Sequence, residues 1–228
     1  MLAADKKTLY RKYKFLKGSI IVIEGNIASG KSTLCERLTE FLSNVGFQAR
    51  LYKEPILQSY LDTFLQNQPK YAFGFQMSML IENQCLYGDA EAFVQSGGIA
   101  IMDRSFMGNR VFASVQHAIG NIDDKEMGLY DDVFRRIGLK TPDYILYLKV
   151  DPNVNVQRCQ KRDRTCEAKV YDVDYFRQLN EHYDRTIEEL KRNQTVLEFD
   201  WNKDIPDSYY SAVLLGVLDD LRAKYLSL

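Results

Sequence analysis

Residues 20–34 read IIVIEGNIASGKSTL, and this stretch decides the fold. Gly25, Gly30, Lys31 and Ser32 match the phosphate-loop pattern G-x-x-x-x-G-K-S/T without a mismatch. The four apolar residues that open the stretch predict a strand buried on both faces, as in a parallel sheet. The residues that follow the loop predict a helix whose first N–H groups and positive dipole end face an anion. Strand, glycine-bounded loop and helix in this order predict a nucleoside triphosphate site rather than a chance turn.

Each part of the predicted loop has a chemical role. The glycines let backbone N–H groups turn inward and form a concavity for phosphate oxygens. Lys31 adds a mobile positive charge for the outer phosphates, and the Ser32 hydroxyl is a ligand for Mg²⁺. The residues expected to bind the phosphates are Gly25, Asn26, Ile27, Ala28, Ser29, Gly30, Lys31, Ser32 and Thr33.

The composition bounds the class of protein. A chain of 228 residues predicts one α/β domain, large enough to bury its own core. The 46% apolar and 27% charged residues are typical of a soluble globular protein, and no apolar run approaches the ~18 residues of a membrane span. A formal net charge of −1 gives no overall attraction to nucleic acid or to an anionic membrane.

The cysteines and residues 1–18 indicate the cellular compartment in which the protein is expected. The four cysteines form no C-x-x-C pair, so neither a zinc site nor a disulfide framework is indicated, and free thiols favour the cytoplasm. Residues 1–18 are basic, and we expect a solvated, partly disordered arm. A cleavable organelle-targeting peptide is the alternative, against which Asp5 and the immediate start of the first strand count.

Apolar periodicity places the remaining elements. Further strands are expected at residues 48–53, 99–102, 144–150 and 195–199. Helices are expected from Lys31 to a left-handed cap at Gly46, and at residues 60–66, 72–95, 106–118, 123–137, 172–192 and 209–225. Five strands that alternate with helices predict a parallel sheet covered by helices on both faces.

Charged residues follow two of the predicted strands. Glu54 precedes Pro55 and therefore ends a strand, where open α/β sheets place their ligands; the alternative is a solvated loop carboxylate. Asp103, Arg104 and Ser105 reach the same edge after the next strand. An acid at this position usually holds Mg²⁺, and an arginine there is too costly to bury without an anionic partner.

Two other patterns leave alternatives open. Gln76, Leu80, Asn83 and Tyr87 share one face of the predicted helix 72–95, and the two amides either pair with backbone or read the edge of a flat polar ligand. A dense charge cluster at residues 158–167 is either a solvated helix or the arginine-rich segment that stabilises a transferring phosphoryl group.

Five motifs in order resemble those of the deoxyribonucleoside kinase family. They are EGNIASGKST at the phosphate loop, Glu54-Pro55, Phe75-Gln76, Asp103-Arg104-Ser105, and R-x-x-x-R-x-R-x-x-E from Arg158 to Glu167. The resemblance spans roughly residues 20–200. It implies a three-layer α/β/α phosphate-loop fold with an arginine-rich lid, and a homodimer formed through helices such as 123–137. The implied reaction transfers the γ-phosphoryl group of ATP, with Mg²⁺, to the 5′-hydroxyl of a deoxynucleoside in nucleotide salvage.

The resemblance also implies roles for individual residues. Glu54 would be the general base, with Arg104 as its partner at the 5′-oxygen. Asp103 and Ser32 would hold Mg²⁺. Gln76 would bond the edge of the base, and Phe75 would form a wall against its ring. Lys31, Arg162 and Arg164 would bind the phosphates, and Arg158 would support the lid beside ATP. Glu167 would accept from the sugar 3′-hydroxyl.

The chain departs from the family pattern at several places. Leu65 stands where a sugar-contacting tyrosine is usual, and Tyr71 is a candidate substitute. The second ring of the base sandwich falls at Ala113, with Phe112 adjacent. Base choice is expected to depend on Asn83 and Asn109. Two other functions are alternatives: a thymidylate-type nucleotide kinase, which would need an extra cation for a monophosphate, and a non-catalytic nucleotide-binding relative with a structural role.

Overall fold

The computed structural model describes residues 5–56, 58–138, 141–161 and 171–227, and the structural statements below refer to these ranges. Five parallel strands lie there in one sheet, in the order β2-β3-β1-β4-β5: β1 (Ile20–Gly25), β2 (Ala49–Tyr52), β3 (Ile99–Asp103), β4 (Tyr144–Lys149) and β5 (Val196–Asp200). The helices are α1 (Lys6–Tyr13), the 3₁₀ turn η1 (Lys14–Leu16), α2 (Lys31–Val45), α3 (Gln58–Gln66), α4 (Gln68–Gln95), α5 (Phe106–Ala118), α6 (Asp124–Ile137), α7 (Pro152–Lys161), α9 (Val173–Leu190) and α10 (Asp207–Leu226).

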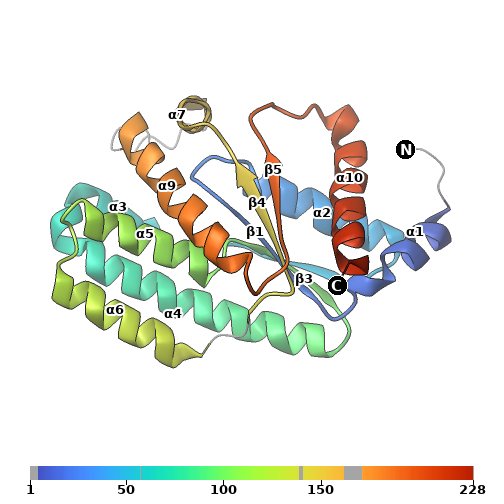
Figure 1. Ribbon diagram of the computed structural model, residues 1–228, viewed down its shortest axis with the longest axis horizontal. Helices are drawn as coiled ribbons and strands as arrows, with labels where there is room; N and C mark the ends of the chain where they lie inside the picture. The colour runs from blue at the N-terminus through green and yellow to red at the C-terminus, as the bar shows by residue number, and fades with distance from the viewer. Residues whose placement is uncertain (1–4, 57, 139–140, 162–170, 228) are drawn as a thin grey trace.

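The sheet separates two groups of helices, as Figure 1 shows. Successive side chains of a strand point to opposite faces. Ile21 and Ile23 of β1 accordingly pack in the hydrophobic cluster of α2 and α10, whereas Ile20 and Val22 pack in the cluster of α4 and α6. The expected three-layer α/β/α fold is confirmed, with β1 buried on both faces.

The strand order positions the ligand site. β1 is the central strand, with β3 on one side and β4 on the other, and Ile23 lies in register with Asp103 of β3. The chain thus builds β2 and β3 on one side of β1 and then crosses to build β4 and β5 on the other. The crevice at the carboxyl ends of the strands at such a switch point is where open α/β sheets bind ligands. The phosphate loop and the residues that follow β2 and β3 all lie at this edge.

Local capping chemistry sets several helix ends. Gly46 closes α2 with φ +113°, which confirms the expected left-handed cap. Helix α6 begins at Asp124, one residue later than expected, because the Asp123 side chain accepts from the N–H groups of Lys125 and Glu126 as an N-cap. Ser105 caps α5 in the same way through Met107 N–H, so α5 starts directly after the Asp-Arg-Ser motif.

The expectation of a partly disordered N-terminal arm is wrong for the described residues. Asp5 caps α1, and the side chains of Tyr13 and Leu16 are fully buried in the cluster beside α2 and α10. Tyr10 stacks on Phe47 with ring centroids 4.5 Å apart. Tyr10, Tyr13 and Leu16 recur at steps of three between the basic residues. This apolar stripe is enough to bury one side of a short helix.

Membrane insertion finds no support in the helices. Among the helices within the described ranges, none combines the length and the apolar character needed to cross a bilayer.

Candidate active site

The phosphate loop depends on two glycines with backbone angles that other residues rarely adopt. Gly25 has φ +152° and Gly30 has φ +96°. A Cβ atom on Gly25 would lie 2.9 Å from the carbonyl oxygen of Leu148, so the loop could not approach β4 as it does. Ala28, inside the loop, also has a positive φ of 58°, and such strain in a non-glycine residue persists only where the surroundings impose it.

Asparagine side chains impose this shape on the loop. Asn26 Nδ2 donates to the carbonyl oxygen of Phe176 at 2.9 Å and to Asn180 Oδ1 at 2.7 Å, both on α9. Its Oδ1 accepts from Ile27 N–H, and Asn155 Nδ2 of α7 donates to the Ile27 carbonyl at 2.8 Å. The loop is therefore bonded to two helices from the second half of the chain, which motif matching does not reveal.

Lys31 is buried at the start of α2 and faces the loop. Its Nζ donates to the carbonyl oxygen of Asn26 at 2.7 Å. Burial, together with the positive charge of Arg104, lowers the pKa of Lys31 to about 8, against the opposing effect of Asp103. A phosphate would replace the carbonyl with a charged partner, and such charge-assisted hydrogen bonds are roughly twice as strong as neutral ones.

Asp103 and Ser32 offer oxygen ligands at the same edge. Both line the cavity described below, and the buried Oδ1 of Asp103 has no hydrogen-bond partner among the described residues. In those residues no group of three His, Cys, Asp or Glu side chains is placed to hold a metal alone. Mg²⁺ usually takes one or two protein oxygens and completes its shell with substrate phosphates and water, so this pair fits Mg²⁺.

Arg104 is buried and has the expected anionic partner. Its Nε atom lies 2.8 Å from Glu54 Oε1, in an ion pair rather than an aligned hydrogen bond. Its guanidinium carbon lies 4.6 Å from the ring centroid of Phe112, and its Nη1 donates to the Tyr183 hydroxyl. Burial acts to lower the pKa of Arg104, but Glu54 and neighbouring charges raise it, so Arg104 stays charged.

Sequence reasoning missed a second carboxylate behind Arg104. Glu24, the last residue of β1 before Gly25, is buried and accepts from Ser105 N at 2.9 Å and Ser105 Oγ at 2.6 Å. Its Oε2 accepts from the Tyr183 hydroxyl at 3.3 Å. Burial raises the pKa of Glu24, although the charge of Arg104 opposes this. The one sequence signal was an acid at the end of an otherwise apolar strand.

A cavity of about 330 Å³ joins these groups. Glu54 and Lys31 both line it, and so do Phe75, Gln76 and Phe112 from α4 and α5. Phe64 stacks behind Phe75 with ring centroids 4.8 Å apart, which holds the Phe75 ring in place. The full lining comprises Ile27, Ala28, Lys31, Ser32, Glu36, Leu51, Lys53, Glu54, Ile56, Leu61, Phe64, Phe75, Gln76, Met79, Asp103, Arg104, Asn109, Phe112 and Tyr171.

The cavity resolves some of the departures from the family pattern. Phe112 lines it and Ala113 lies in the hydrophobic core, so Phe112 is the one of the two that faces the cavity. Neither Leu65 nor Tyr71 lines it, but Tyr171, which sequence reasoning missed, does. Asn83 is buried outside the lining, with its Nδ2 donating to the Met79 carbonyl, so its contact with a base stays a prediction.

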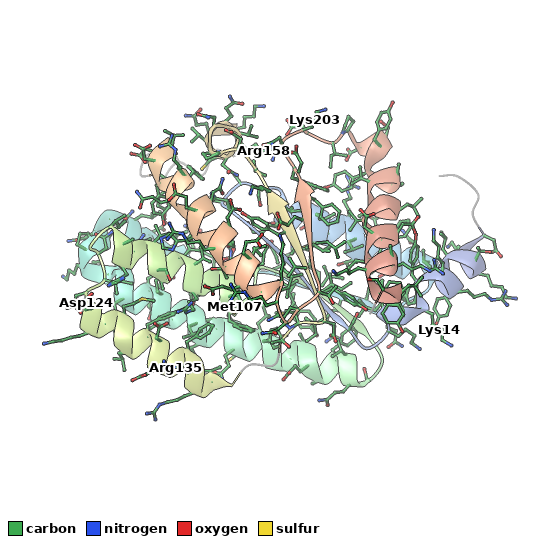
Figure 2. All side chains as sticks on the ribbon, viewed as in Figure 1. Lys14, Met107, Asp124, Arg135, Arg158 and Lys203 are labelled. Atoms are coloured by element: carbon green, nitrogen blue, oxygen red, sulfur yellow. The ribbon has the colours of Figure 1, made fainter. Side chains whose placement is uncertain are left out.

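Arg158 has different neighbours from those expected. Its guanidinium donates to the carbonyl oxygens of Trp201 and Asn202 and pairs with Asp204 at 3.0 Å, and it does not line the cavity. Figure 2 shows it beside the loop that carries Lys203. It therefore supports the segment between β5 and α10. The other expected lid residues, Arg162, Arg164 and Glu167, lie outside the described residues.

The fold and the site define a phosphate-loop kinase: a loop suited to phosphates, two oxygen-bearing side chains that fit a metal, and a carboxylate with its arginine, all facing one cavity. Residues 21–212 match the family model described as deoxynucleoside kinase. The chain belongs to the deoxynucleoside kinase family.

Two relatives and one solved structure illustrate the similarity. The chain is 26% identical over 211 residues to a deoxyadenosine kinase of Dictyostelium discoideum, covering 92% of this chain and 83% of that protein. It is 29% identical over 220 residues to a probable deoxycytidine kinase of fowlpox virus, covering 90% and 89%. The deoxyadenosine kinase of M. mycoides, solved with the products dCMP and a flexible dCDP bound, shares the fold with a TM-score of 0.75, 22% identity and coverage of 90% and 99%.

Proposed function

We propose that this enzyme transfers the γ-phosphoryl group of ATP to the 5′-hydroxyl of a deoxynucleoside, with Glu54 as the general base. The observation that carries the proposal is that Glu54 and Lys31 line the same cavity, between rings that suit a base and a loop that suits phosphates. A carboxylate at that place can orient a sugar hydroxyl toward the terminal phosphate and take its proton.

The remaining residues of the site position the two substrates and neutralise the charge of the phosphates. Phosphoryl transfer passes through a loose transition state, so positioning and charge stabilisation matter more than covalent chemistry. Arg104, fixed between Glu54 and Tyr183, holds the Glu54 carboxylate and offers positive charge near the acceptor oxygen. Phe75 and Phe112 would enclose the base, and Gln76 would bond its edge. Arg162 and Arg164 would clamp the phosphates, and Glu167 would accept from the 3′-hydroxyl.

Mg²⁺ would be held by Asp103 and Ser32, and it would neutralise phosphate charge during transfer. Support comes from the unpartnered Oδ1 of Asp103, which lies buried beside the cavity.

A phosphoryl-transfer panel tests the proposal. The four natural deoxynucleosides and their 5′-monophosphates are each incubated with γ-labelled ATP and Mg²⁺, and the labelled products are separated. We expect label on at least one deoxynucleoside and on no monophosphate. A 2′,5′-dideoxynucleoside, which lacks the acceptor hydroxyl, is the matched control. Label only on monophosphates would indicate a nucleotide kinase, and ATP binding without transfer would indicate a non-catalytic relative.

The proposal extends to the oligomeric state of the enzyme and to its cellular compartment. We expect a homodimer that uses helices such as α6, as the resemblance to the family implies. Light scattering on the purified protein measures its mass directly. We also expect the enzyme to act in the cytoplasm, where the thiols of Cys35 and Cys85 stay reduced.

A further inference from the structure

Three buried side chains from three helices form a hydrogen-bonded chain that ends in the cavity. The Tyr130 hydroxyl of α6 donates to Asn109 Oδ1 at 2.5 Å, and Asn109 Nδ2 of α5 donates to Gln76 Oε1 at 3.0 Å. Each of the three side chains is at most 3% exposed. Gln76 and Asn109 line the cavity and Tyr130 does not, so Tyr130 acts on a ligand only through its neighbours.

The tyrosine hydroxyl fixes the direction of the chain. An amide has a donor end and an acceptor end, and a rotation by 180° exchanges them. Within the described residues, Asn109 is the hydrogen-bond partner of the Tyr130 hydroxyl. If Asn109 were rotated, its Nδ2 would face that hydroxyl, whose hydrogen would then be buried without an acceptor. Burial also raises the pKa of Tyr130, so the hydroxyl keeps its proton and remains a donor.

The orientation of the Asn109 amide determines the orientation of the Gln76 amide. Because Asn109 presents Nδ2, Gln76 must turn its Oε1 toward Asn109. Its Nε2 makes no hydrogen bond with any residue in the described ranges, and it is left to donate to a ligand. Gln76 therefore offers an ordered pair of groups, a donor at one end of its amide and a partly engaged acceptor at the other.

An ordered pair of this kind distinguishes two classes of base. Adenine and cytosine carry an exocyclic amino donor beside a ring-nitrogen acceptor. Guanine and thymine carry an exocyclic oxygen acceptor beside a ring N–H donor. A glutamine free to rotate can bond either edge, whereas a glutamine held in one orientation leaves both of its groups mispaired with the wrong class.

We infer that Tyr130 is a positioning residue that fixes the Gln76 amide through Asn109 and so makes the enzyme discriminate 6-amino and 4-amino bases from their oxo counterparts. The inference rests on the proposed phosphorylation of deoxynucleosides and goes beyond it by naming what selects the base. The class that is favoured is the same for purines and pyrimidines, because the order of exocyclic group and ring nitrogen is the same in both.

The test uses pairs of substrates that differ in this edge alone: deoxyadenosine with deoxyinosine, and deoxycytidine with deoxyuridine. We expect wild-type kcat/KM to differ by about 10²-fold within each pair, in favour of the same class in both. In Tyr130→Phe each ratio falls by about tenfold, mainly through KM, while kcat on the preferred substrate changes little. Tyr87→Phe is the matched control, because the buried Tyr87 hydroxyl of α4 has no hydrogen-bond partner among the described residues. We expect Tyr87→Phe to leave the kcat/KM ratio within each substrate pair unchanged.

Each outcome is decisive. Ratios in Tyr130→Phe that stay within twofold of wild type overturn the inference, and so do wild-type ratios near one in both pairs. If Tyr130→Phe does not fold, Asn109→Leu breaks the same chain at its middle with a side chain of similar size, and it must lower the ratios in the same direction. No phosphorylation of any nucleoside by the wild type overturns the proposed function itself, whereas normal phosphorylation with unchanged ratios overturns only the role of Tyr130.

Discussion

The Nε atom of Arg104 lies 2.8 Å from Oε1 of Glu54, and this contact joins the residues that follow two neighbouring strands, β2 and β3. Arg104 reaches it with φ +71°, in the left-handed region that costs a non-glycine residue of order 1 kcal/mol. Such strain persists because the guanidinium is held on several sides, by Glu54, Phe112 and Tyr183. The position of the Glu54 carboxylate thus depends in part on Tyr183, which contacts Arg104 and does not line the cavity.

Glu54→Gln should lower kcat by about 10²–10⁴-fold, the usual size of a general-base contribution. Glutamine keeps the shape of the side chain but cannot take the proton of the acceptor hydroxyl. Steady-state kinetics give kcat, and calorimetric titration of the deoxynucleoside checks that binding survives. Turnover close to wild type would exclude Glu54 as the base.

Tyr183→Phe should lower kcat by about 10–100-fold, because a hydrogen bond to a charged group contributes about 1.5–3 kcal/mol. The variant removes the oxygen that accepts from Arg104 and the hydroxyl that donates to Glu24. The matched control is Tyr147→Phe, since the Tyr147 ring stacks on Tyr183 but its hydroxyl donates to Asp184. Equal losses in the two variants would mean that packing alone is at work.

Gly108→Ala should destabilise the protein and lower its activity. A Cβ atom on Gly108 would lie 2.6 Å from both Arg104 Cγ and Glu24 Oε2. Overpacking of this kind costs about 1–3 kcal/mol. Gly128→Ala in α6 is the matched control, because a Cβ there meets nothing within 4 Å, and it should stabilise the helix by about 0.5–1 kcal/mol. Denaturant unfolding of both variants measures the difference, and effects of the same sign would contradict the expectation.

ATP affinity should fall as pH rises above about 8. Lys31 has a pKa lowered to about 8, so at higher pH it is neutral and must take up a proton before it can pair with phosphate. The affinity therefore decreases toward alkaline pH, with a limit of about tenfold per pH unit. Calorimetry with ATP and EDTA from pH 7 to 9.5 measures the slope without metal. Lys31→Arg keeps its charge throughout and should show no such slope; a flat profile in the wild type would contradict the prediction.

The parts of the fold that local chemistry determines could be predicted from the sequence. Helix α5 has the predicted bounds, Phe106–Ala118, because Ser105 is an N-cap directly after a buried strand. The phosphate loop and the edge shared by Glu54 and Asp103 follow from glycine positions and strand ends, which are short-range signals.

The parts that depend on distant contacts could not be predicted. Tyr183 meets Arg104 across 79 positions, and Asn26 meets Asn180 across 154. Arg158 is expected to support the lid beside ATP, but no sequence pattern indicates its hydrogen bonds to the carbonyl oxygens of Trp201 and Asn202 after β5. The N-terminal arm is expected to be solvated because it is basic, and a count of charges does not show which side of a helix they occupy.

The hydrogen bonds that the side-chain amides of Asn26 and Asn155 donate hold the phosphate loop in its curved shape through contacts within the protein. Conformational entropy is therefore lost once, when the chain folds, and not again each time a nucleotide arrives. Lys31 has to exchange a partner, leaving the Asn26 carbonyl for a phosphate oxygen. The phosphate loop should therefore change little when a nucleotide binds. Diffusion and charge, and not rearrangement of this loop, should set the association rate.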